Sequence, residues 1–123
     1  MVTSRRRIKE ALSKKEPEKL EIEHTMCLVF AKSGFKIRHY EDGKSQGSFD
    51  VTINNIRADL KKTRSTNNII RYGKHAIRVQ HAEIILVEFE RWDNKFRDVV
   101  SELSRKGIHG YYFITGKEQI HSF

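Results

Sequence analysis

The sequence predicts an α/β (α+β) fold in which a central mixed β-sheet of about five or six strands is flanked by helices on both faces. The main observation is an almost wholly apolar run at residues 83–90, EIILVEFE, which is typical of a central strand covered on both faces. Amphipathic helical patterns precede and follow this run, and short alternating segments elsewhere indicate further strands. The expected element order is therefore α-β-β-β-α-β-α-β-β.

The first half of the chain is expected to hold one helix and three strands. A helix over residues 17–33 begins at Pro17, which suits a first helical turn, and ends before Gly34, which suits a helix C-terminus. FKIRHYE at residues 35–41 alternates like a strand, and DGKSQGS after it is expected to be a loop. FDVTI and IRADLK are two further strands, joined by a turn at Asn54-Asn55.

The second half continues with alternating helices and strands. After a loop, KTRST, a helix is expected over residues 67–82, with Ser65 or Thr66 as its candidate N-cap. The apolar strand follows, and then an amphipathic helix over residues 93–106 that ends at Gly107. HGYYFIT at residues 109–115 predicts a strand, Gly116-Lys117 a turn and QIHSF a last short strand.

The chain of 123 residues predicts a single domain over residues 17–123, preceded at residues 1–16 by a basic arm or short helix. Its net charge of +8 and pI of about 9.7 favour a polyanionic partner, namely nucleic acid, an acidic protein or an anionic membrane surface. The single Cys27 excludes a disulfide framework within the chain and suits a buried thiol. No membrane span is expected, because no apolar stretch approaches ~20 residues.

The hairpin has a register that its own residues specify. A two-residue turn at Asn54-Asn55 pairs Asp50 with Asp59. A slip by one residue would bury the charged side chains, so the pairing is well defined. The expected apolar face comprises Phe49, Val51, Ile53, Ile56, Ala58 and Leu60. The expected polar face comprises Asp50, Thr52, Arg57, Asp59 and Lys61.

The pairing of Asp50 with Asp59 is the main indication of a functional site. Directly opposed like charges destabilise a strand pair. Two carboxylates a few ångströms apart share a proton or hold a cation, and Mg²⁺ takes carboxylate oxygens together with waters. The alternative is that both aspartates are exposed and point apart, with Arg57 and Lys61 neutralising them.

Two further polar residues fall on apolar helical stripes. Glu23 lies on the stripe of the first helix formed by Leu20, Cys27, Phe30 and Ala31, where an unpaired charge is unusual. Gln80 continues the stripe of the second helix, in which Gly73 and Ala76 suggest close packing on the sheet. Both are candidates for the same polar cluster as the aspartates. The alternatives are a surface ion pair for Glu23 and a satisfied buried amide for Gln80.

Basic residues lie beside this expected cluster. The second helix carries a face at helical spacing that could contact a phosphate backbone, although a solvated charged face is the simpler explanation. The candidate nucleic-acid-binding residues are Lys62, Arg71, Lys74, His75 and Arg78.

The order of these residues resembles the PD-(D/E)XK nuclease superfamily, and more narrowly the C-terminal toxin domains of contact-dependent growth inhibition and related polymorphic toxin systems. The resemblance covers roughly residues 23–90: a helix glutamate, a strand aspartate, a strand with D-x-K ("ADLKK") and a helix leading into "RVQHAEIILVEF". Two positions depart from the pattern. "FD" replaces proline-aspartate, and the second acid is Asp rather than the commoner Glu.

The resemblance implies a restriction-endonuclease-like core and metal-dependent hydrolysis of phosphodiester bonds. It implies that Asp50, Asp59 and Glu23 hold Mg²⁺ or another divalent cation such as Mn²⁺ or Zn²⁺. Lys61 would then assist the attacking water, and Gln80 would match the glutamine often found after the motif. It further implies RNA such as tRNA as a substrate more than DNA, and an acidic immunity protein as partner. Action would be in the cytoplasm, after delivery as the C-terminal part of a larger secreted protein.

Three other functions are compatible with the sequence. A metal-independent RNase toxin of the barnase or colicin type would use histidines for acid-base chemistry, and the candidates are His75, His81, His109 and His121. A non-catalytic nucleic-acid-binding regulator would suit the basic charge. A nuclease fold without activity would serve as a partner-binding domain, with YYF at residues 111–113 as a candidate interface.

Overall fold

The computed structural model describes residues 17–39 and 49–123. The expected basic arm at residues 1–16 and most of the loop after the first strand lie outside the described residues. The described elements follow the expected order. They are α2 (Pro17–Lys32), β1 (Ile37–His39), β2 (Val51–Ile53), β3 (Ile56–Thr63), α3 (Ile69–Arg78), β4 (Ile84–Phe89), α4 (Asn94–Arg105), β5 (Gly110–Ile114) and β6 (His121–Ser122).

The strands form one six-stranded sheet in sequence order, β1-β2-β3-β4-β5-β6. The central pairs β3–β4 and β4–β5 are parallel, whereas β1–β2, β2–β3 and β5–β6 are antiparallel. Each parallel pair is connected through a helix, α3 or α4, as parallel strands require. The predicted mixed sheet and the α+β fold class are therefore confirmed.

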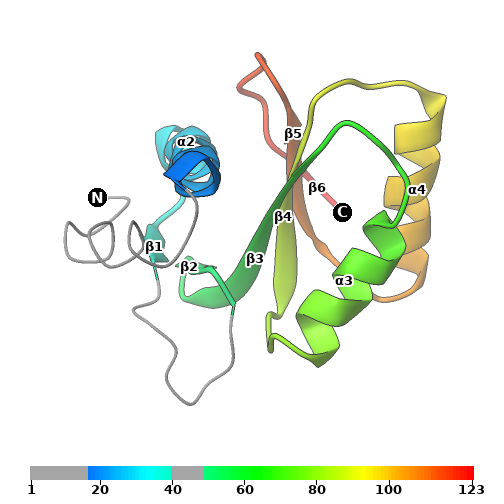
Figure 1. Ribbon diagram of the computed structural model, residues 1–123, viewed down its shortest axis with the longest axis horizontal. Coiled ribbons are helices and arrows are strands. Elements are labelled where there is room, and N and C mark those ends of the chain that lie inside the picture. Colours follow the sequence, from blue (N-terminus) through cyan, green and yellow to red (C-terminus); the bar gives the residue numbers. More distant parts are fainter. Residues whose placement is uncertain (1–16, 40–48) are drawn as a thin grey trace.

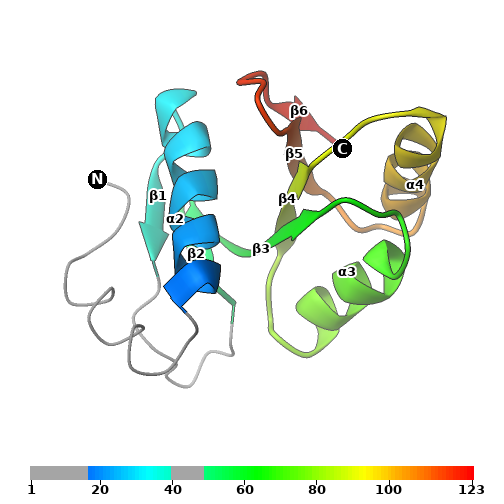
Figure 2. The same cartoon turned by 45° about the horizontal axis from the view of Figure 1, so that its top comes forward.

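The helices cover both faces of the sheet. Figure 1 shows α2 on one side of the sheet and α3 with α4 on the other, and Figure 2 shows the same three-layer arrangement from a second direction. The central strand β4 alternates between two cores. Ile85, Val87 and Phe89 pack with α3 and α4, whereas Leu86 packs with α2. This alternation explains why residues 83–90 are almost wholly apolar, because a strand that is buried on both faces needs apolar side chains on each face.

The hairpin has the register that the sequence predicts. Ile53 pairs with Ile56, and Val51 pairs with Ala58. Asn54 and Asn55 both adopt left-handed backbone conformations, with φ of 50° and 71°, as a tight two-residue hairpin turn requires. The predicted apolar face is wrong at two positions. Phe49 packs in the core on the α3 and α4 side, and Ile56 is 38% exposed beside the turn.

The predicted helix over residues 67–82 is wrong at both ends. The helix α3 spans only Ile69–Arg78, and its N-cap is Asn68 in a left-handed conformation rather than Ser65 or Thr66. Ser65 instead accepts a hydrogen bond from the backbone N–H of Asn67 within the loop. After the helix, His81 adopts a φ of 65° and the Ala82 N–H donates to the Ala76 carbonyl, which turns the chain into β4.

Other boundaries shift because pairing with neighbours decides where a strand ends. β3 continues to Thr63, two residues into the predicted KTRST loop, because Thr63 still pairs with Phe89 of β4.

Gly73 was expected to pack on the sheet. A Cβ at this position would instead lie 3.2 Å from the Ile108 side chain, so Gly73 sets the spacing of α3 against the segment after α4. In the described part of the chain, no helix has the length and apolar character to cross a membrane.

Gly110, at the start of β5, lies where no side chain fits. A Cβ built there would overlap the backbone carbonyl of Ile85, its partner in β4. We expect Gly110→Ala to lower the free energy of unfolding by at least about 3 kcal/mol, because the two central parallel strands must separate. Chemical denaturation measures this change.

Gly116→Ala is the matched control for that experiment. Gly116 has a φ of +87°, but nothing lies within 4 Å of a Cβ there. Its replacement should cost only about 1 kcal/mol of backbone strain. Equal losses for the two variants would contradict the close approach of Gly110 to Ile85.

Candidate functional site

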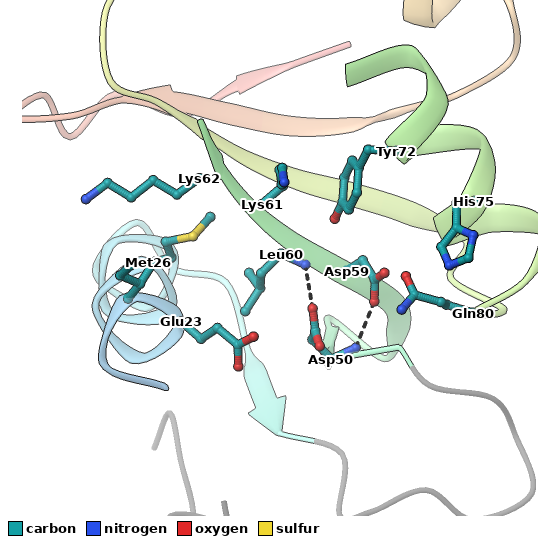
Figure 3. Close-up of a pocket in the computed structure, with 11 residues that line it drawn as sticks. Glu23, Met26, Asp50, Asp59, Leu60, Lys61, Lys62, Tyr72, His75 and Gln80 are labelled. Carbon is teal, nitrogen blue, oxygen red and sulfur yellow. Dashed lines mark hydrogen bonds between the residues drawn. The ribbon is translucent and has the colours of Figure 1, made fainter. Parts of the chain in front are cut away.

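A pocket lies beside the part of β3 that β2 does not cover. The last β2–β3 pair in register is Val51 with Ala58, whereas β3 continues for five more residues to Thr63. The pocket has a volume of about 370 Å³ and opens between α2 on one face of the sheet and α3 on the other (Figure 3). Its lining comprises Ile22, Glu23, Met26, Asp50, Asp59, Leu60, Lys61, Lys62, Tyr72, His75 and Gln80. We call it the carboxylate pocket.

Asp50 and Asp59 are held together by reciprocal bonds to the opposite backbone. The Asp50 N–H donates to Asp59 Oδ1 at 3.0 Å, and the Leu60 N–H donates to Asp50 Oδ2 at 2.9 Å (Figure 3). Asp59 is only 2% exposed. These bonds to backbone N–H groups keep both side chains in the pocket.

The alternative of two exposed aspartates is wrong, because Asp59 is buried and Asp50 is partly buried. The Arg57 side chain donates to the His81 carbonyl at 2.9 Å and lies 3.8 Å from the Glu83 carboxylate. Lys61 places its ammonium 5.4 Å from the centre of the Tyr72 ring. The bonds to the backbone of the hairpin hold the two aspartates side by side.

Glu23 reaches the same pocket from the opposite layer. It is 4% exposed, and its carboxylate points from α2 toward Asp50 (Figure 3). The negative charges of Glu23, Asp50 and Asp59 all influence one group, the Tyr72 hydroxyl. Burial raises the pKa of Tyr72 well above 10.0, and these three carboxylates raise it further, Asp59 most. The carboxylates thus converge on one region, although they come from α2, the start of β2 and β3.

Tyr72 is a polar pocket residue that the sequence analysis missed. Its hydroxyl is buried and has no hydrogen-bond partner within the described residues. Its ring lies beneath the Lys61 ammonium, which is an arrangement that stabilises a cation over an aromatic face. A signal was present in the sequence, because position 72 lies three residues after Ile69 and four before Ala76, and therefore borders the apolar stripe of α3.

Gln80 lines the pocket, but not from the helix. Because α3 ends at Arg78, Gln80 stands in the turn after it, where its N–H donates to the His75 carbonyl at 3.2 Å. The prediction that Gln80 continues the helical stripe is wrong, although its position at the pocket agrees with the prediction. His75 is the one of the four candidate histidines that lines the carboxylate pocket.

The candidate nucleic-acid-binding residues divide into two sets. Lys62 and His75 line the carboxylate pocket, and Arg71 and His75 line a second hollow beside it. Lys74 and Arg78 are not among the lining residues of either hollow. Lys62 is partly neutralised, because its ammonium lies 3.7 Å from the carboxylate of Glu88, a buried residue that the sequence analysis did not single out. Thr115 also donates to Glu88, at 2.6 Å.

Cys27 is a structural residue next to the site. It is fully buried, with its sulfur 3.8 Å from the His39 ring. Burial, with smaller contributions from Glu23 and Asp50, raises the pKa of the thiol from 9.0 to about 12. A thiol in this state is neither a nucleophile nor a ready metal ligand at neutral pH. The expectation of a plain buried thiol therefore agrees with the structure.

The donor set at the pocket is a pair of carboxylates with a third nearby. Within residues 17–39 and 49–123, no three His, Cys, Asp or Glu side chains come close enough together to hold a metal ion by themselves. Asp50 and Asp59 supply two adjacent carboxylates, and Glu23 faces them across the pocket.

Comparisons with known proteins bear on the fold. No protein-family model matches the chain, and no curated protein matches it. The chain is similar to a solved structure described as a CdiA-CT/CdiI toxin and immunity complex from Burkholderia pseudomallei. The TM-score is 0.64 at 16% sequence identity, and the match covers 85% of this chain and 83% of the other. At this identity the similarity establishes a shared fold.

Removing the Tyr72 hydroxyl tests its environment. An unpaired buried hydroxyl costs about 1–3 kcal/mol, so Tyr72→Phe should raise the free energy of unfolding at pH 7. The pKa of Tyr72 is higher in the folded than in the unfolded chain. As the pH rises above the unfolded pKa of about 10, the unfolded chain releases the phenol proton while the folded chain keeps it, so the wild type loses stability. The variant should therefore lose less stability than the wild type above about pH 10.

Denaturant titrations at neutral and alkaline pH measure both effects. A Tyr72→Phe variant that is less stable at pH 7, or that shows the same alkaline loss as the wild type, would contradict an unpaired hydroxyl facing carboxylates.

Proposed function

We propose that the chain is a metal-dependent endonuclease that hydrolyses phosphodiester bonds in nucleic acid, with RNA favoured over DNA, and that it serves as a toxin domain. The observation that carries this proposal is the pair of aspartates fixed side by side in a pocket of a chain with a net charge of +8. A basic protein has no electrostatic need to oppose two carboxylates, and the arrangement costs stability unless a cation offsets it.

The residues present fit a hard divalent cation. Mg²⁺ is usually held by one or two carboxylates plus waters and substrate phosphates, and Asp50 with Asp59 provides such a pair. Mn²⁺ accepts the same oxygen ligands, whereas Zn²⁺ prefers nitrogen and sulfur. The thiol of Cys27, next to the pocket, is held protonated by burial. The donor chemistry therefore favours Mg²⁺ or Mn²⁺, and Glu23, which lines the same pocket, would bind a coordinated water.

Each pocket residue has a role in this proposal. A bound divalent cation would lower the pKa of a coordinated water and offset charge on the phosphate. Asp50 and Asp59 would hold that cation, and their backbone bonds keep the carboxylates in place without reorganisation. Lys61, oriented by the Tyr72 ring, stabilises the negative charge that develops on the phosphate. Gln80 and His75, at the rim of the pocket, orient the water or the substrate by hydrogen bonds.

The toxin role rests on the shared fold with a protein described as a CdiA-CT toxin solved together with CdiI as a toxin and immunity complex. By that analogy we propose an acidic immunity protein as the partner of this basic chain, because opposite charge speeds association and favours binding. The same analogy supports action in the cytoplasm after delivery as the C-terminal part of a larger protein, and it is the basis for preferring RNA such as tRNA.

One observation favours a second candidate, a metal-independent RNase. His75 and Lys61 both line the pocket, and histidine and lysine are side chains that can act in general acid-base catalysis. The other candidate histidines lie elsewhere; His121, for example, stacks on Tyr112 with ring centres 4.9 Å apart. The two candidates differ in their dependence on divalent cations and on Asp59.

Replacement of Asp59 tests the proposal. We expect Asp59→Asn and Asp59→Ala to lower the rate of cleavage of tRNA or plasmid DNA with Mg²⁺ by at least ~100-fold, because one of the two metal-binding carboxylates is lost. Asp59→Asn keeps an oxygen for the Asp50 N–H and removes one of two like charges, so its stability should match or exceed that of the wild type. Cleavage and thermal unfolding are measured on the same preparations.

Asp98→Ala is the matched control, because Asp98 is an exposed aspartate on α4, far from the pocket lining. EDTA should abolish cleavage, and Mg²⁺ or Mn²⁺ should restore it. Cleavage that persists in EDTA and is lost in His75→Ala would favour the metal-independent RNase. Binding of nucleic acid with no cleavage under any condition would favour a non-catalytic binding protein.

A further inference from the structure

The carboxylate pocket continues into a second hollow along α3. The second hollow has a volume of about 410 Å³ and shares Lys61, Tyr72 and His75 with the carboxylate pocket. It reaches the loop before α3, and its cations are Lys61 and Arg71. No carboxylate is among its lining residues, which comprise Lys61, Thr63, Asn67, Asn68, Ile69, Arg71, Tyr72 and His75.

A third hollow adjoins the second at Asn67. It has a volume of about 230 Å³ and lies where the loops after β3 and β4 meet the start of α4. Its cations are Arg64, Arg91 and Lys95, and again no carboxylate is among its lining residues. Because β3 and β4 are parallel, both loops leave the sheet at the same edge. We call the second and third hollows together the basic groove.

The cations at the far end of this groove are available for a ligand. Neither Arg64 nor Lys95 forms an ion pair with another described residue, and both are exposed. Arg91 is held between the Asp93 carboxylate at 3.4 Å and the Phe96 ring at 5.6 Å. Its charge is therefore partly offset, and it serves to shape the groove wall.

The loop that carries Arg64 is ordered by its own hydrogen bonds. Thr63 Oγ1 donates to the Ser65 carbonyl at 3.0 Å and accepts from the Ser65 N–H at 3.1 Å. The Glu90 N–H donates to the Thr63 carbonyl at 2.9 Å, which ties this loop to the one that follows β4. A preformed loop loses little conformational entropy when a ligand binds, so its cations contribute more to affinity.

We propose that the basic groove is a binding site for the phosphodiester backbone of the nucleic acid on one side of the cleavage position. This inference rests on the proposed function, since the groove leads out of the carboxylate pocket. Contacts of this kind hold the strand through phosphates and carry no base sequence. The groove therefore assigns binding to Arg64 and Lys95, which lie 31 positions apart in the sequence, rather than to Lys74 and Arg78 of α3, which line neither hollow.

Binding measurements with a cleavage-deficient parent test the proposal. The parent is the full chain with Asp59→Asn, and the probe is a fluorescent single-stranded RNA of about 20 nucleotides, longer than most single-domain binding sites. Arg64→Ala with Lys95→Ala should weaken binding at ~0.1 M salt roughly 10- to 30-fold. The slope of log K against log salt should fall by about 1.4, because each phosphate contact on a single strand contributes about 0.7.

Arg105→Ala with Lys117→Ala is the matched control, because it removes the same charge from exposed positions outside the three hollows. The control should change both quantities by much less. Equal weakening by the two double variants, no weakening by the groove variant, or no RNA binding by the parent would each overturn the inference. A groove variant with an altered thermal unfolding midpoint is replaced by Arg64→Gln with Lys95→Gln, which must show the same loss of affinity.

Cleavage by the wild type is measured separately. If the wild type cleaves and the groove variant binds like its parent, the nuclease proposal stands and the groove proposal is wrong. If the groove variant loses affinity but the wild type never cleaves, the groove is a binding site and the nuclease proposal is wrong.

Discussion

The exchange of hydrogen bonds between Asp50 and the backbone of β3 determines how the rest of the site is built. Val51 and Ala58 form the last pair of the β2–β3 ladder. The Asp50 N–H then donates both to the Ala58 carbonyl and to the Asp59 side chain, and the Leu60 N–H donates to the Asp50 side chain. The two carboxylates therefore keep their places through the backbone of a hairpin. The other pocket residues come from α2, β3, α3 and the turn after α3, and they surround a pair that is already fixed.

The layers of the fold explain why residues far apart in the sequence meet there. Successive residues of β3 point to opposite faces of the sheet, so Leu60 packs with α2 while Lys61 lies over Tyr72 of α3. A pocket at the uncovered side of β3 is open to both layers. This placement allows Glu23 on one helix and His75 on another to line a single cavity, although the sheet separates the helices.

Much of this architecture could be predicted because local patterns specify it. The hairpin register follows from Asn54-Asn55 and the apolar residues beside them, and the buried strand β4 follows from its composition. The ends of α3 could not be predicted, because Ser65 bonds within its loop and His81 turns the chain toward β4. The contributions of Tyr72 and Glu88 depend on which side chains face them across elements, and a single sequence carries little information about that.

The end of the β2–β3 ladder also affects how readily the sheet could pair with a strand of another molecule. Past Ala58, β3 offers backbone groups along an edge that β2 does not cover, and such an edge is a template for a strand from another molecule. The Asp50 side chain already occupies the Leu60 N–H, and its charge with that of Asp59 repels an incoming strand. Charged side chains at a strand edge disfavour pairing with another chain, so the two aspartates that form the pocket also protect this edge of β3.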